Sequence, residues 1–370
     1  MTAMDRPSEV QAKMELVRAW LDRFHREGVL FASQASFAWI TAGGHDHISL
    51  GEAAGVGAVL VTPEEAYLLT TNIEVGRLLE EELGGVSFTA IDWPWHDSSR
   101  PRSIVAELCD PARSASDIGV YGLPTAADLA ELRFTLLPPE IGRYRRLGRD
   151  AAASVEEACR ATAPGDTELE VAGRVAMECS RRNILPLVNL VASDARIARY
   201  RHPLPTGNRV GRTVLVALTG RRHGLHASLT RMVSFGPLDA ELAFRQSAVS
   251  RVDARMILES RPGASLAEVM RRGMDQYASE GFPDEWRRHH QGGLTGYAGR
   301  EVFATPTAGH RLGTNQVVAW NPSITRVKSE DTVLVTNTGV DVLTRTDQWP
   351  QERIELPVGA LERPVLGVFP

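Results

Sequence analysis

The chain has 370 residues, a length that suits two domains better than a single domain. Hydrophobic residues make up 43% of it and charged residues 24%, which is typical of a globular protein and excludes the disordered and fibrous classes. With 41 basic and 46 acidic residues the formal net charge is −5, which argues against nucleic acid and anionic membrane surfaces as partners.

The first part of the chain alternates between helical and strand-like patterns. Apolar residues at Val10, Met14, Val17 and Leu21 have the spacing of a helix. The pattern predicts helices at 8–27, 73–83, 103–109 and 125–133, and strands at 37–41, 57–62, 66–71, 86–93 and 118–122. This alternation predicts a small α/β domain over residues 1–138.

Pro138 and Pro139 mark the expected boundary, because proline suits a linker immediately before a helix and not a helix interior. Beyond them the pattern predicts helices at 141–163, 168–182, 238–260 and 264–279, and strands at 185–193, 212–220, 226–236, 316–320 and 331–339. We therefore expect a second, larger domain over 139–370 and an α/β (α+β) fold class.

Cysteine usage and the N-terminus indicate the compartment. Cys109, Cys159 and Cys179 are far apart and form no CxxC pair, so neither a disulfide framework nor a zinc–thiolate site is expected. The first twenty residues lack the apolar region of a signal peptide, and no apolar run reaches the roughly 18 residues of a membrane span. These features predict a cytoplasmic protein.

Several short segments follow one another between about residues 140 and 345. They read APGDTELEVA, YRHPLPTGNRV, VLVALTGRRHGLHASLTRMV, HHQGGLTGYAGRE, AWNP and VKSEDTVLVTNTG. In this order they resemble the pita-bread family, which includes methionine aminopeptidase, aminopeptidase P, prolidase, creatinase and ectoine hydrolase. The resemblance implies a pita-bread catalytic-type domain, preceded by the α/β domain that the creatinase- and prolidase-like members carry.

The resemblance also locates the metal ligands of the family's peptidases, which hold two divalent ions with two Asp, one His and two Glu. These positions fall on Ala217, Ser228, Gly293, Asn321 and Glu330, so only the last glutamate remains. Four of the five residues are unsuitable, since Ala217 and Gly293 offer no side-chain donor and the neutral Ser228 and Asn321 are poor substitutes for a bridging carboxylate. We therefore expect neither a dinuclear centre nor another cofactor, although clustered histidines leave metal binding elsewhere open.

Histidines remain as candidates for acid–base chemistry. His202 matches the histidine that the resemblance to creatinase implies as principal acid and base, and an imidazole can exchange a proton near neutral pH. Glu330 and a second histidine would activate water; His290 is favoured slightly over His289 for the position facing the pocket. His226 lies two residues before the second lost aspartate position, so strand alternation directs it to the same side.

Further residues are expected to contact a substrate. The run that contains Tyr297, Arg300 and Glu301 resembles a creatinase segment whose arginine binds the substrate carboxylate, while a surface ion pair is the alternative for Arg300. Ser228 and Asn321 occupy former ligand positions. Ser228 either pairs with a histidine as a nucleophile or only fills the vacated space.

The sequence therefore predicts a metal-independent hydrolase of a C–N bond, amide or amidine, in a small molecule. One alternative is an Xaa-Pro aminopeptidase-like metallopeptidase with a degenerate site, and another is a catalytically inactive pita-bread binding protein. The resemblance to creatinase further implies a homodimer in which the N-terminal domain contributes to the partner's active site.

Overall fold

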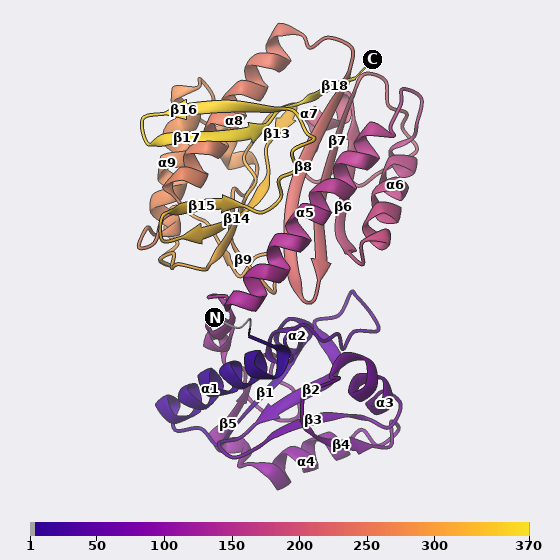
Figure 1. The fold of residues 1–370 in the computed structure, drawn as a ribbon, viewed down its shortest axis with the longest axis vertical. Coiled ribbons are helices and arrows are strands. Elements are labelled where there is room, and N and C mark those ends of the chain that lie inside the picture. Colours follow the sequence, from indigo (N-terminus) through magenta and orange to yellow (C-terminus); the bar gives the residue numbers. More distant parts are fainter. Residues whose placement is uncertain (1–3, 370) are drawn as a thin grey trace. The chain divides into compact units, whose positions relative to one another are not determined.

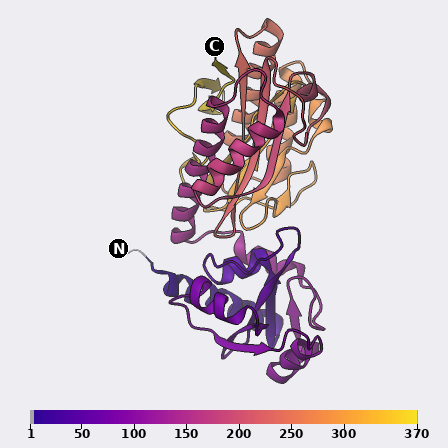
Figure 2. The ribbon, with the colours of Figure 1, turned by 90° about the vertical axis from the view of Figure 1, so that its right-hand side faces the viewer.

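The computed structural model describes residues 4–369, so residues 1–3 and 370 of the expected domain ranges lie outside it. The chain divides into two compact units (Figures 1 and 2). One contains the residues up to Ile141 together with His223–Leu225, and the other contains Gly142–Arg222 and the residues from His226 onward. No helix between residues 4 and 369 is long and apolar enough to cross a membrane.

The first unit is built on a five-stranded sheet with the order β4-β3-β2-β1-β5. Its strands are β1 Gly28–Ser33, β2 Ala54–Val61, β3 Ala66–Thr71, β4 Thr89–Trp93 and β5 Ser114–Ser116. Its helices include α1 Arg6–Phe24, α2 Gln34–Ile40, α3 Val75–Arg77 and α4 Arg100–Leu108, with a π-helical turn at Leu78–Glu82 and a 3₁₀ turn at Ala127–Arg133. The unit is a small α/β layer structure.

Two strand predictions in this unit are wrong. Residues 37–40 belong to helix α2 and Thr41 is its C-cap, because Ser33 caps the start of the segment by accepting a hydrogen bond from the backbone N–H of Ser36 at 3.1 Å. A short apolar run reads equally as a buried helix or a buried strand, so the cap decides. Residues 118–122 form no strand, since Gly119, Tyr121 and Gly122 all have positive φ angles that an extended strand excludes.

The second unit contains four long helices. They are α5 Pro138–Arg160, whose first residues belong to the other unit, α6 Glu168–Arg181, α8 Ala240–Glu259 and α9 Leu266–Ser279, with a short α7 at Ala195–Arg199. Capping boxes begin α6 at Thr167 and α9 at Ser265. The two prolines expected in a linker instead form the first turn of α5, where the missing N–H groups have no intrahelical partner to lose.

Two sheets form the body of the second unit (Figure 1). One has the order β18-β8-β7-β6 and the other the order β10-β9-β11-β14-β15. The strands are β6 Leu185–Ser193, β7 Thr213–Arg222, β8 Leu225–Phe235, β9 Gly292–Thr295, β10 Val302–Phe303, β11 Val317–Trp320, β14 Asp331–Thr336, β15 Gly339–Val342 and β18 Gly367–Phe369. Two small hairpins add β12 Ser323–Ile324 with β13 Val327–Lys328, and β16 Gln351–Leu356 with β17 Gly359–Pro364.

Strand β8 meets the second sheet at two backbone contacts. The N–H of His226 donates to the carbonyl of Gly296 at 2.9 Å, and the N–H of Thr230 donates to the carbonyl of Glu330 at 3.1 Å. These contacts bring the middle of β8 against the loop after β9 and the start of β14. The polar segments of the sequence motifs therefore gather at one seam.

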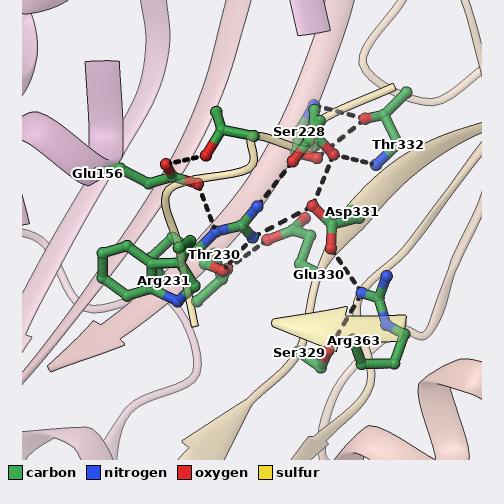
Figure 3. A network of polar contacts seen from close by, with 12 residues as sticks. Glu156, Ser228, Thr230, Arg231, Ser329, Glu330, Asp331, Thr332 and Arg363 are labelled. Carbon is green, nitrogen blue, oxygen red and sulfur yellow. Dashed lines mark hydrogen bonds and ion pairs between the residues drawn. The ribbon is translucent and has the colours of Figure 1, made fainter. Parts of the chain in front are cut away.

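A buried ionic network lies beside this seam (Figure 3). Arg231 of β8 contacts Glu156 of α5 at 3.4 Å and Asp331 of β14 at 3.2 Å. Arg363 of β17 binds the second oxygen of Asp331 at 2.6 Å and reaches Asp253 of α8 at 2.5 Å. All five side chains are almost completely buried, so the network fixes the start of β14, immediately after Glu330.

Candidate functional site

The second unit contains a cavity of about 400 Å³ at the seam between its two sheets. The apolar part of its lining is formed by Leu187, Val188, Leu190, Ala217, Leu218 and Phe303. The polar part of the lining, the polar wall, is formed by the side chains of His202, Thr219, His226, His290, Arg300, Asn321, Lys328 and Glu330. This volume and mixed lining suit a small molecule with both an apolar and a charged end.

Glu330 is the one carboxylate among the described residues that line the cavity. Its Oε2 atom accepts hydrogen bonds from Lys328 Nζ and from Thr230 Oγ1, each at 2.7 Å, while Arg300 Nη2 lies 3.7 Å from Oε1. Burial alone would raise the pKa of Glu330, but the two cations and these hydrogen bonds bring it below its usual value. The carboxylate is therefore ionised and already satisfied by two cations.

Three imidazoles lie close together, and two of them, His202 and His290, line the polar wall. The Nε2 atoms of His202 and His289 are 3.0 Å apart, and the ring centroids of His289 and His290 are 4.6 Å apart. His289 is buried, whereas the side chains of His202 and His290 are partly enclosed and partly open to solvent. The phenyl ring of Phe303 meets His290 edge-on at 5.3 Å.

Burial and neighbouring cations keep these three imidazoles neutral. Burial, then the charges of Lys328 and the other two rings, lowers the pKa of His289 to about 2. Burial and Arg300 lower the pKa of His290 to about 4. The pKa of His202 is also lowered, first by burial and then by Lys328, although Glu330 opposes the shift. All three rings therefore have a lone pair available at neutral pH.

Buried hydrogen bonds hold the histidine segment in place. Gln291 Nε2 donates to the carbonyl of His289 at 2.7 Å, and Gln291 Oε1 accepts from Tyr277 at 2.8 Å. The Tyr277 oxygen in turn accepts from the backbone N–H of Ser323 at 2.9 Å. Helix α9, strand β12 and the histidine segment are thus connected by side chains that the sequence analysis did not single out.

Arg300 Nε and Asn321 Oδ1 are buried atoms of the polar wall that have no hydrogen-bond partner among the described residues. The other end of the Arg300 guanidinium donates to the carbonyl of Gly299 at 2.6 Å. Asn321 Nδ2 lies 3.4 Å from His290 Nδ1. An unsatisfied buried donor and acceptor on one cavity wall indicate that a ligand completes the site.

Six of the sequence-predicted site residues line the cavity: His202, His226, His290, Arg300, Asn321 and Glu330. The other three do not line it. The hydroxyl of Ser228 is 2.9 Å from that of Thr219, Tyr297 is 1% exposed, and Glu301 accepts a hydrogen bond from the backbone N–H of Ala298 at 3.0 Å. Their positions do not support the substrate-binding role expected for Ser228, Tyr297 and Glu301.

Lys328 is the charged residue of the cavity that was not predicted from the sequence. One signal was present, because Lys13 and Lys328 are the only two lysines among the 41 basic residues. Both are buried and both contact carboxylates, Lys13 with Glu9 and Glu140 and Lys328 with Glu330. A lysine within a family motif, in a chain with so few lysines, therefore indicated a buried position beside a carboxylate.

The residues at the carried-over ligand positions do not fit a dinuclear metal centre. Ala217 offers no donor, and Gly293 has φ +147° with the carbonyl of Val302 only 2.1 Å from where a Cβ atom would lie. The backbone there excludes any side chain, including histidine. Asn321 is neutral, the Ser228 hydroxyl pairs with Thr219, and Glu330 pairs with cations. A pair of metal ions bridged by carboxylates has no ligand set here.

Known proteins show where this architecture occurs. The prolidase of Pyrococcus horikoshii OT3 has 18% sequence identity, a TM-score of 0.77 and covers 91% of this chain and 99% of its own. The Xaa-Pro dipeptidase of Bacillus anthracis also has 18% identity and a TM-score of 0.77, with 97% and 100% coverage. The N-terminal domain of FACT complex subunit SPT16 from Cicer arietinum has 12% identity, a TM-score of 0.69, and 93% and 97% coverage.

These similarities at low identity concern the fold. No curated protein matches the sequence. The family model of metallopeptidase family M24 matches residues 142–337, more than half of the chain and all of the cavity. The chain therefore belongs to metallopeptidase family M24, the pita-bread family that its motifs resemble.

Proposed function

We propose that this chain hydrolyses an amide or amidine C–N bond in a small carboxylate-bearing molecule, with imidazole acid–base chemistry in place of a dinuclear metal centre. The observation that carries the proposal is the polar wall of the cavity. It combines neutral imidazoles with two cations and a single carboxylate, which leaves one excess positive charge when the imidazoles are neutral. Such a site favours an anionic ligand over a cationic one.

The proposed reaction needs one proton carrier and one anion anchor. His202 takes a proton from the attacking water as the new C–O bond forms, and returns it to the leaving nitrogen as the C–N bond breaks. Arg300 binds the substrate carboxylate through its unpartnered Nε–H. The ammonium of Lys328, held by Glu330 at 2.7 Å, offers positive charge to the oxygen that becomes negative during attack.

A substrate screen tests this proposal. Amidines, cyclic amides and N-acyl amino acids are incubated with the full chain in the presence and absence of a chelator. For the substrate found, we expect His202→Ala to lower kcat by about 10²-fold or more, as loss of a general base does. His310→Ala is the matched control, because His310 contacts Gln316 at 2.9 Å and does not line the cavity. A fully active, folded His202→Ala chain would refute the assigned role.

The second candidate function is an Xaa-Pro metallopeptidase. It is favoured by membership of family M24 and by the similarity in fold to a prolidase and an Xaa-Pro dipeptidase. Hydrolysis of Xaa-Pro dipeptides that requires added Mn²⁺ or Co²⁺, together with about two bound ions per chain, would favour this function over the first. Hydrolysis that is insensitive to a chelator would favour the first.

A further inference from the structure

We propose that His202, His289 and His290 form a binding site for a single divalent transition-metal ion. Each ring offers one nitrogen, and the three nitrogens lie within 4.8 Å of one another. Three imidazoles with an open fourth position are a common ligand set for zinc, and imidazole also suits copper, iron and nickel. Because no carboxylate belongs to the set, hard ions such as Mg²⁺ and Ca²⁺ are not expected there.

His202 and His289 are close to a coordinating geometry, whereas the His290 nitrogen, which lies within 4.8 Å of the other two, has to approach by up to about 1.4 Å. The Nε2 atoms of His202 and His289 are 3.0 Å apart and share one proton in a hydrogen bond. Tetrahedral zinc with Zn–N bonds of about 2.0–2.1 Å separates its ligand nitrogens by roughly 3.4 Å. The two rings therefore have to move apart by only a few tenths of an ångström, and metal binding displaces the shared proton.

Residues beside the rings can hydrogen-bond the ring nitrogens that do not bind the metal, which fixes the metal-binding tautomer. His289 Nδ1 lies 3.4 Å from the hydroxyl of Ser323, and His290 Nδ1 lies 3.4 Å from the side-chain amide of Asn321. Asn321 is 98% buried, and its Oδ1 atom has no partner. With the amide turned over, Oδ1 accepts the Nδ1–H of His290, which leaves Nε2 of that ring free to bind metal. In that orientation the buried oxygen gains a partner, and Nδ2 takes the position that has none.

The nearby charges affect how strongly the three histidines bind a metal ion and whether an anion binds with it. Lys328 and Arg300 oppose a dication, while Glu330 offsets one of the two. A small anion at the open position would offset the other. We therefore expect weaker metal binding than at a structural zinc site, and binding that is strengthened by a small carboxylate such as acetate.

Titration of the chelator-treated full chain with Co²⁺ tests the site. We expect one ion per chain, visible absorption bands of a four- or five-coordinate complex, and displacement by Zn²⁺. His202→Ala, His289→Ala and His290→Ala should each weaken binding at least tenfold, and His310→Ala should leave it unchanged. Asn321→Ala should weaken it about tenfold through loss of the outer partner, and serves as a second variant where the buried His289→Ala fails to fold.

No saturable binding of Co²⁺, or binding that the three histidine substitutions leave unchanged, would overturn the proposal. Two equivalents bound in a manner that depends on Glu330 would also overturn it, because that result belongs to a dinuclear centre. The readout is binding and not turnover. Failure of the proposed hydrolase function would therefore leave this inference standing, and loss of the metal site would leave the hydrolase function untouched.

Discussion

The ammonium of Lys328 controls the proton affinity of His202. After burial, its charge is the largest influence that lowers the pKa of His202 below the usual 6.5. A general base must be neutral, so activity falls as the pH drops through that pKa, and the acid limb of wild-type kcat/KM should lie below pH 6.5. In Lys328→Met the lowering charge is lost while Glu330 remains, so the limb should move to higher pH.

The matched variant is Lys328→Arg, which retains the positive charge beside Glu330. Its acid limb should stay close to that of the wild type even if kcat falls, because the guanidinium has a different geometry from the ammonium. The measurement is the pH profile of kcat/KM for the three proteins. An acid limb at the same pH in Lys328→Met would show that His202 is not the group that titrates.

Individual residues of the site were predictable to different degrees. The family motifs predicted that His202, Arg300 and Glu330 lie at one cavity, because each residue is part of a recognisable sequence motif. Strand alternation placed Ser228 on the same side as His226, yet Ser228 turns to Thr219 and does not line the cavity. Lys328 was missed because its position depends on the two-residue strand β13, which has no periodicity of its own.

At the scale of elements, one buried side chain of the hairpin β16–β17 binds two other elements of the second unit. Arg363 of β17 is fully buried and binds both Asp253 of α8 and Asp331 of β14. In Arg363→Met two buried carboxylates lose their shared cation, which should lower the free energy of unfolding by about 3–5 kcal/mol. Thermal and denaturant unfolding of the purified chain provide the measurement.

Arg353→Met is the control for this substitution. Arg353 lies on β16 of the same hairpin, and its side chain is 64% exposed. Among the described residues its one ion pair is with Glu355, at 3.4 Å. Exposed pairs of this kind contribute about 0–1 kcal/mol, so its unfolding transition should barely move. Equal destabilisation by both substitutions would mean that the hairpin depends on its strand residues in general and not on the buried network.

The boundaries of helices and strands were predicted most accurately where the local sequence pattern was strong. Helices α6 and α9 were predicted almost to the residue, since each begins with a capping box and continues with an amphipathic pattern. The strands β16, β17 and β18 were not predicted. β18 pairs with the distant β8, and pairing of that kind leaves little trace in a local sequence pattern. The strands β16 and β17 form a local hairpin, but charged residues outnumber or match the apolar ones in each, which hides the strand pattern.

At the scale of the whole molecule, the fold and the cavity point to different chemistry. The fold is that of family M24, and the resemblance of the motifs implies two metal ions in the peptidases of that family. The cavity of this chain instead holds one carboxylate bound to two cations. If the cavity residues determine the chemistry, then dialysis against EDTA should leave kcat/KM for the substrate found within about twofold of its starting value. No general base or anion anchor is removed by that treatment.

Adding Zn²⁺ back provides the complementary measurement. An ion held by His202, His289 and His290 occupies the lone pair with which His202 would accept a proton, so Zn²⁺ should inhibit hydrolysis in proportion to its occupancy. In Asn321→Ala, where the metal is expected to bind more weakly, the inhibiting concentration should rise in parallel with the dissociation constant of Co²⁺. Activation by Zn²⁺ would instead assign the chemistry to a metal-bound water, and would reject the metal-independent mechanism while supporting the three-histidine site.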